Sequence, residues 1–373
     1  MVTRGRNAAE IAAQLVEQLA GSELVLAVVF ADWRIDPQAL AAAVHRGLAP
    51  AATLGCTTTR VLGAPAGEGF AAAAIGLYGD WLRAGIGIAP ELPKSALMRS
   101  RDAVLQAVAA LGTTTDALSP VRHVAFTLVD GRCGHEEAFC IGSAAAAPRI
   151  RFVGGSAGTE VATARRPYIW VNGELLGDAG VVVMLDSALP FHAITSSHLV
   201  PTDVRAVVTA ASGRVVSELD GQPAVERLHQ LVDQIVAAGG EPLDDARPSQ
   251  YSFGRFVDGY PYVRSIVRLD GPQIHLATAV EIGHVLRVMR PVDLIGTTER
   301  DLAAAAAQVG GAMSAAILCS CEGRHWEAAA KELEGELAEC YARYPTTGFQ
   351  SFGEQSGMLQ VNHTLTGLVF GGA

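Results

Sequence analysis

Arginine and histidine occur together in two loops of the sequence, and this pairing is the first sign of a binding site. Arg132 precedes His135, and Arg324 directly precedes His325, in each case soon after a run of apolar residues. A guanidinium group can hold a carboxylate through two parallel hydrogen bonds, and a neutral imidazole is a common metal ligand. The alternative is that both arginines pair with neighbouring acidic residues and that both histidines are solvated.

Further candidates lie in a glycine-rich segment and at predicted strand ends. The backbone N–H groups of Gly154, Gly155 and Ser156 can bind an anion, although the same glycines also permit close packing. Glu354 can receive an amine of a ligand or cap a turn. His198 follows a predicted strand and is either a metal ligand or a histidine that hydrogen-bonds within its own loop.

The cysteines give a weaker signal. Cys321 lies in the same loop as Arg324 and joins the ligand-binding candidates, but no second Cys or His pair follows at the spacing of a zinc finger. Cys56 ends a predicted strand and is a possible nucleophile, yet the sequence offers no identifiable base. Since P-loop and H-E-x-x-H motifs are also missing, a binding protein is favoured over an enzyme, with no catalytic residue assigned.

The candidates fall at equivalent places in an approximate internal repeat. Each unit has an apolar run, a polar loop, a helix and a second short strand, and the apolar runs cover 24–30, 124–129 and 316–321. This order predicts βαβ units in parallel sheets, whose strands end at one common edge, where ligands bind. The residues expected on this rim are Arg132, His135, Arg324, His325 and Glu354.

Between the second and third units the pattern becomes strand-like. Asn172-Gly173 predicts a type I′ hairpin between 168–171 and 174–176. Further strand pairs are expected at 204–210 with 215–219 and at 262–269 with 273–280; a helix is expected at 223–238, and a strand containing His363 at 360–370. The predicted fold class is α/β, with repeated βαβ units in parallel or mixed sheets interleaved with antiparallel hairpins, in two fused domains at 1–220 and 221–373.

Composition excludes several classes of function. The net charge is −10 and no basic run occurs, which argues against nucleic acid as a partner. The most apolar long stretch, 302–318, is interrupted by Gln308 and Gly310-Gly311, and therefore predicts a helix and a strand rather than a membrane span. The dispersed cysteines and the missing signal peptide predict reduced thiols in the cytoplasm.

The sequence resembles the FIST family from about residue 24 to 370. In the N-terminal part the similarity is carried by 30–33, 54–57, 153–158, 168–173, 195–198 and 218–224. In the C-terminal part it is carried by 262–266, 286–291, 321–324, 349–354 and 362–366. The resemblance implies a non-enzymatic sensor of a small ligand in signal transduction. One departure is Thr159-Glu160, where the family usually has an acidic residue directly after the glycine-rich segment.

One bacterial branch of this family binds haem, responds to nitric oxide and regulates histidine kinases or cyclic-di-GMP enzymes. The resemblance therefore implies a non-covalent haem b, with His198 as the first candidate for the axial ligand and His135 and His325 as alternatives. A haem propionate would pair with Arg132 or Arg324. An amino-acid-like small molecule is the alternative ligand.

Overall fold

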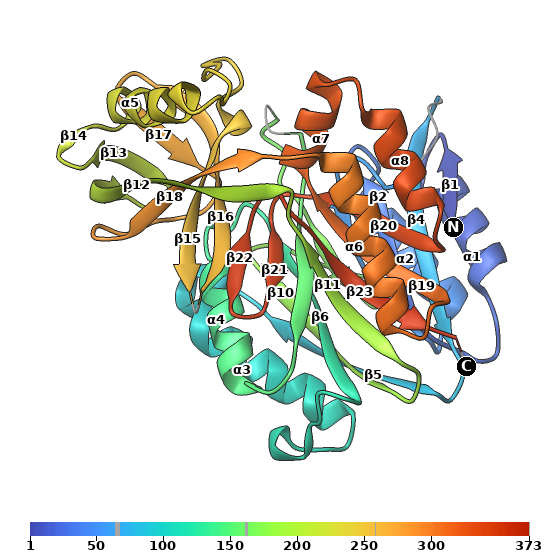
Figure 1. Ribbon diagram of the computed structural model, residues 1–373. Coiled ribbons are helices and arrows are strands. Elements are labelled where there is room, and N and C mark those ends of the chain that lie inside the picture. The colour runs from blue at the N-terminus through green and yellow to red at the C-terminus, as the bar shows by residue number, and fades with distance from the viewer. Residues whose placement is uncertain (64–67, 161–162, 258, 373) are drawn as a thin grey trace.

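The computed structural model describes residues 1–63, 68–160, 163–257 and 259–372. Within these ranges the strands form four sheets, and helices cover their outer faces (Figure 1). The first sheet has the strand order β1 (Val2–Gly5), β4 (Phe70–Tyr78), β2 (Leu24–Asp32), β3 (Ala52–Thr58), β8 (Ile169–Val171) and β9 (Glu174–Leu176). The second has the order β22 (Leu359–Val361), β21 (Glu354–Ser356), β7 (Phe152–Ala157), β6 (His123–Asp130), β10 (Gly180–Ser187) and β5 (Leu82–Ala89).

The third and fourth sheets contain most of the later residues. The third has the order β11 (Phe191–Ser196), β23 (Leu365–Gly371), β19 (Met313–Cys321) and β20 (Thr346–Ser351). The fourth has the order β12 (Leu199–Ser212), β18 (Val285–Pro291), β15 (Ser252–Val257), β16 (Tyr260–Asp270), β17 (Gln273–Leu276), β13 (Val215–Leu219) and β14 (Gln222–Pro223). Because β12 also pairs with β13, the fourth sheet closes on itself as an antiparallel barrel.

The three predicted βαβ units are confirmed, one in each of the first three sheets. In the first, β2 and β3 are parallel and joined by α2 (Pro37–Leu48); in the second, β6 and β7 are joined by α4 (Glu136–Ala146). In the third, α7 (Glu322–Ala330) and α8 (Glu334–Ala342) join the parallel strands β19 and β20. The α/β fold class follows, with parallel units interleaved with antiparallel hairpins.

Local sequence explains the first unit. Asp36 caps α2 by accepting a hydrogen bond from the N–H of Ala39 at 3.1 Å, and proline occupies the first helical position. In β2, alternate side chains point to opposite faces: Val28 and Phe30 face the centre of the molecule, while Val29 packs against the helices. A strand covered on both faces must be apolar throughout, as this one is.

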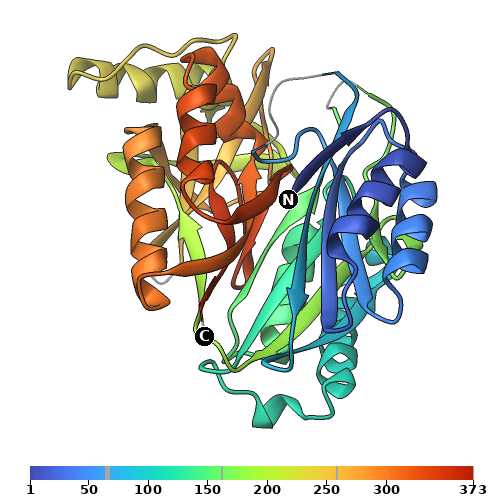
Figure 2. The same cartoon turned by 90° about the vertical axis from the view of Figure 1, so that its right-hand side faces the viewer.

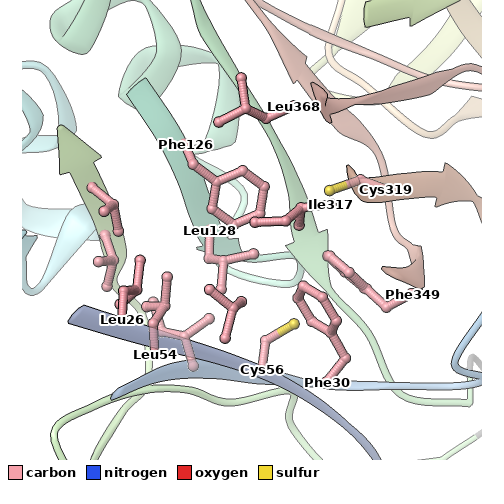
Figure 3. Packing of buried hydrophobic residues seen from close by; sticks show 14 of the residues in the cluster. Leu26, Phe30, Leu54, Cys56, Phe126, Leu128, Ile317, Cys319, Phe349 and Leu368 are labelled. Carbon is pink, nitrogen blue, oxygen red and sulfur yellow. The ribbon is translucent and has the colours of Figure 1, made fainter. Parts of the chain in front are cut away.

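Each of the first three sheets carries helices on its outer face. The first is covered by α1 (Ala8–Leu19) and α2, the second by α3 (Leu92–Ala110) and α4, and the third by α6 (Leu294–Gln308) and α8. Their inner faces meet in one apolar cluster, in which Phe30 stacks on Phe349 with ring centroids 4.5 Å apart (Figure 3). Among the described helices, none combines the length and apolar character needed to span a membrane.

The barrel lies to one side of this three-sheet body, with α5 (Ala224–Ala237) packed against it (Figures 1 and 2). Two partly buried ion pairs fix it to the second sheet. Arg214 contacts Glu136 at 2.7 Å, and Arg264, which is fully buried, contacts Glu137 at 2.7 Å. Both glutamates belong to the first turn of α4, so this helix sets the position of the barrel relative to the second sheet.

The expected hairpins are present, and one expected strand is wrong. Asn172 and Gly173 have φ values of 49° and 83°, as a type I′ turn requires, and β12–β13 and β16–β17 pair as antiparallel hairpins. A single strand at 360–370 does not form. Instead His363 adopts a left-handed conformation with φ of 57°, which ends β22 and starts β23 in a different sheet.

The chain crosses between sheets in both directions. The late hairpin β21–β22 adds to the second sheet, where Glu354 pairs with Gly155, and the earlier strand β11 pairs with the final strand β23. Glu354 itself is fully buried: it accepts hydrogen bonds from the Ser351 hydroxyl at 2.6 Å and from the backbone N–H and hydroxyl of Thr364. Burial raises the pKa of Glu354 to about 8, because removal from water penalises the carboxylate.

This pKa predicts that stability depends on pH through Glu354. A carboxyl group whose pKa is raised on folding stabilises the fold below its ordinary pKa of 4.5, and this contribution is lost as the pH rises towards 8. The substitution Glu354→Gln replaces the carboxyl O–H donor with an amide N–H donor and removes the ionisable group. Between pH 5 and 9 we expect the wild-type free energy of unfolding, measured in urea, to fall by about 2–4 kcal/mol more than that of the variant. Glu281→Gln, at an exposed position, serves as control. Equal pH slopes for wild type and Glu354→Gln would contradict the buried protonated state.

Candidate functional site

A cavity of about 330 Å³ lies where the strand ends of the second and third sheets face the barrel. We call it the rim cavity. Gly131 and Arg132 follow β6, Cys321 to Gly323 end β19 and begin α7, and Ser351 with Phe352 end β20. The remaining lining residues are Arg214, Ser249, Ser265, Ile266, Val267, Arg268, His275, Leu276, Ala277, Trp326 and Asn362. The expectation that a ligand-sized hollow lies at the carboxyl ends of the parallel strands therefore agrees with this geometry.

Two buried polar groups of the rim cavity have no hydrogen-bond partner among the described residues. They are the hydroxyl of Ser265 and the side-chain amide nitrogen Nδ2 of Asn362, in side chains 6% and 1% exposed. The other end of the Asn362 amide, Oδ1, accepts a hydrogen bond from Thr278, which fixes the orientation of Nδ2. An unpaired buried polar group costs about 1–3 kcal/mol, so a ligand that pairs with these groups recovers that cost.

Three arginines line the rim cavity, and two of them also pair with acidic residues outside it, Arg214 with Glu136 at 2.7 Å and Arg268 with Asp270 at 3.0 Å. The third is Arg132, and Glu322 is the acidic side chain of the lining among the described residues. Burial raises the pKa of Glu322, against the hydrogen bond that it accepts from Thr59 at 2.6 Å. The guanidinium of Arg132 lies 5.9 Å from the ring centre of Phe352 and donates to backbone carbonyls of the loop that follows β7. Apolar surface comes from Phe352, Leu276 and Trp326, so the lining suits an anion with an apolar part.

Of the residues proposed from the sequence, two line the rim cavity, namely Arg132 and Cys321. The glycine-rich candidates serve packing instead. A Cβ atom at Gly154 would lie 1.9 Å from the carbonyl oxygen of Thr127, and one at Gly155 would lie 2.8 Å from Cys319 and from Phe349. The N–H of Ser156 donates to the carbonyl of Gly353 at 2.8 Å. These three residues therefore allow neighbouring strands to pack closely and do not form an anion-binding site.

The other predicted rim residues point elsewhere. His135 precedes α4 without lining the rim cavity, and Glu354 is enclosed by Ser351 and Thr364 as described above. His325 lies 3.5 Å from Glu334, and burial lowers its pKa. Of the five side chains expected on a common rim, Arg132 lines the rim cavity and the other four do not.

Arg324 and His198 meet in the interior, in a cluster that also contains Glu327 and His363. Both histidines direct Nε2 at the same carboxylate oxygen, Oε2 of Glu327, at 2.6 Å for His198 and 3.0 Å for His363. Nη1 of Arg324 lies 3.5 Å from Nδ1 of His198, and its Nη2 donates to the hydroxyl of Thr298 at 2.7 Å. We call these four side chains, Arg324, His198, Glu327 and His363, the interior cluster.

Protonation in the interior cluster follows from its burial. Removal from water lowers the pKa of His198 to about 4, against the hydrogen bond to Glu327, so the imidazole is neutral at neutral pH. Burial works to raise the pKa of Glu327, but the hydrogen bonds of His198 and His363 outweigh it and hold this pKa far below its ordinary value. A neutral imidazole and an ionised carboxylate result.

This geometry does not fit His198 as the axial ligand of a haem. The side chain is fully buried, both ring nitrogens face protein groups, and it does not line the rim cavity. His135 and His325 also lie outside the rim cavity, whereas His275, which was not singled out from the sequence, lines it. Sequence reasoning also missed Glu327, Ser265 and Asn362, although Ser265 and Asn362 lie in the family-like segments 262–266 and 362–366.

The cysteines give no support to nucleophilic catalysis. All six lie in the described residues, and each is a buried free thiol. Burial raises the pKa of Cys56 well above its ordinary value, so the thiolate needed for attack is disfavoured.

The chain has limited similarity to two individual proteins. A segment of 111 residues is 32% identical to an uncharacterized protein of Methanocaldococcus jannaschii; it spans 30% of this chain and 21% of that protein. A crystal structure of cyanuric acid hydrolase from A. caulinodans aligns over 100% of this chain and 99% of its own, with a TM-score of 0.32 and 12% identity, values at which the similarity carries no argument.

Two domain families together match most of the sequence. The FIST N domain matches residues 25–222 and the FIST C domain matches residues 224–357. The first match ends in the barrel, between β13 and α5, and the second ends after β21, so the rim cavity takes residues from both. The chain therefore belongs to the FIST family, whose domains sense small ligands in signalling systems.

Proposed function

We propose that this chain is a sensor that binds a small carboxylate, of the amino-acid class, in the rim cavity. The observation that carries the proposal is the combination of two unpaired buried polar groups, Ser265 and Asn362, with three arginines in one hollow. The arginines supply the site for a carboxylate, and Nδ2 of Asn362 supplies a fixed donor for an acceptor atom elsewhere in the ligand.

A ligand bound in the rim cavity can change the conformation of the rest of the protein. The FIST N match contributes Arg132 and Arg214 to the wall, and the FIST C match contributes Ser265 and Trp326. A ligand that contacts both stabilises the arrangement in which these walls are correctly spaced, and so shifts the population of conformations. A partner enzyme, such as a histidine kinase or a cyclic-di-GMP enzyme, then responds to that population.

Haem-based sensing of nitric oxide is the second candidate. It is favoured by an imidazole among arginines, since His275 lines the rim cavity and Arg132, Arg214 and Arg268 can pair with propionates. However, both ring nitrogens of His275 lie 3.3 Å from Nη2 of Arg268, whose positive charge opposes an iron ion at this position. The carboxylate proposal is therefore preferred.

The carboxylate proposal predicts the effect of two cavity substitutions. Asn362→Asp is isosteric, keeps the acceptor for Thr278 and removes the donor Nδ2; Arg268→Gln removes an exposed cation. With the twenty amino acids and simple carboxylates screened by thermal shift, and the strongest ligand measured by calorimetry, each substitution is expected to weaken binding by about 1–3 kcal/mol. Trp326 fluorescence gives an independent readout of occupancy.

Arg205→Gln is the matched control, because Arg205 lies exposed on the barrel strand β12 and not in the rim cavity. Its affinity should equal that of wild type. If no amino acid or carboxylate shifts the melting temperature, or if Asn362→Asp binds with unchanged affinity, the proposed site is wrong.

The haem alternative has its own spectroscopic test. Purified chain is mixed with haem, and the Soret band is compared for wild type, His275→Ala and His198→Ala. With a carboxylate sensor, no saturable band should develop. A one-to-one band that is lost in His275→Ala and kept in His198→Ala would establish haem in the rim cavity, whereas loss in His198→Ala would require the interior cluster to open.

A further inference from the structure

Three potential metal ligands converge in the interior from distant parts of the chain. His198 lies between β11 and β12, Glu327 is on α7, and His363 lies between β22 and β23. One ligating atom from each lies within 4.8 Å of the other two. Nε2 of each imidazole points at the same atom, Oε2 of Glu327, so the three potential ligand atoms lie next to one another.

We propose that His198, Glu327 and His363 form a binding site for a divalent transition metal ion, with Zn²⁺ as the preferred ion. Two imidazoles with one carboxylate are a ligand set that Zn²⁺ uses with a fourth position left open, and the same set suits Co²⁺ and Fe²⁺. This site is separate from the rim cavity and does not depend on the function proposed for it.

The observed spacing needs only a small expansion to admit the ion. Around a tetrahedral ion with bonds of about 2.0–2.1 Å, neighbouring donor atoms lie roughly 3.3 Å apart. Here the donor atoms of His198 and His363 lie 2.6 Å and 3.0 Å from Oε2 of Glu327. Each of these two distances must increase by less than about 1 Å, and rotation of the side chains can supply such a change.

The ligands are held in place by their neighbours. The second oxygen of Glu327, Oε1, accepts a hydrogen bond from Lys331 at 2.7 Å, which leaves Oε2 directed at the histidines. His363 is 1% exposed, and its Nδ1 has no partner among the described residues. Glu327 also borders a second cavity of about 300 Å³, lined in addition by Lys331 and Arg247, which gives an ion a path to the site.

Arg324 competes with the ion. When its Nη1 donates to Nδ1 of His198, the ring proton lies on Nε2 and points at Glu327. Coordination through Nε2 requires the other tautomer, whose Nδ1–H would face the guanidinium. The charge of Arg324 opposes that of the ion as well, so this residue limits the affinity.

The test is a titration of the chelator-treated full chain with Co²⁺, followed by its visible d–d absorption, and with Zn²⁺ by calorimetry. We expect one ion per chain, with the dissociation constant raised at least tenfold in Glu327→Gln and in His363→Ala. Arg324→Met is expected to lower it by about tenfold, because the competing donor is gone. Zn²⁺ should raise the melting temperature of wild type.

His325→Ala and Glu334→Gln are matched controls, since they disrupt a neighbouring His–Glu pair on the same helices, and both should bind as wild type does. Circular dichroism identifies variants that fail to fold. If Glu327→Gln does not fold, the affinities of His363→Ala and Arg324→Met for the ion test the proposed metal site. Failure of wild type to bind Co²⁺ would overturn the proposal, and so would unchanged affinity in His363→Ala. Ligand binding in the rim cavity should persist in every folded variant, so that the two proposals can fail separately.

Discussion

The three parallel units meet across a shared apolar cluster, and the positions of the strand ends that line the rim cavity opposite the barrel depend on that contact. Phe30, Phe126 and Phe349 come from three different sheets and pack together within it (Figure 3). The contact is tight enough that Gly155 has no room for a side chain beside Cys319. Because interiors are densely packed, a shift of one sheet would move the ends of the others and change the spacing of the rim.

Local features of the sequence were enough to predict the units themselves. Each of these features involves only a few neighbouring residues. Apolar runs predict buried strands, Asp36 predicts the start of a helix, and Asn172-Gly173 predicts a hairpin turn. The edge on which a ligand would bind followed from the same reasoning. In contrast, the threonine partner of Asn362 and the two histidine partners of Glu327 lie more than thirty residues away along the chain, and no local pattern specifies them.

Helix α7 shows why Arg324 and His325, which the sequence predicts to share one rim, point in different directions. The segment after β19 was expected to be a loop, in which Arg324 and His325 would both reach the edge. It is instead the first turn of a helix, in which successive side chains are turned by about 100°. Gly323 and Trp326 therefore face the rim cavity, Arg324 and Glu327 face the interior cluster, and His325 faces Glu334. One short helix thus touches both of the candidate sites.

The exchange of strands between the two halves of the sequence constrains how the protein can be made. Until residues 354–356 leave the ribosome, β7 has a neighbour on one side only, and β11 must wait for the last strand of the chain, β23. Unpaired strand edges of this kind favour pairing with other chains. The N-terminal half therefore remains incomplete until residues 354–356 and 365–371 have been synthesised, and its unpaired edges are exposed to other chains during that interval.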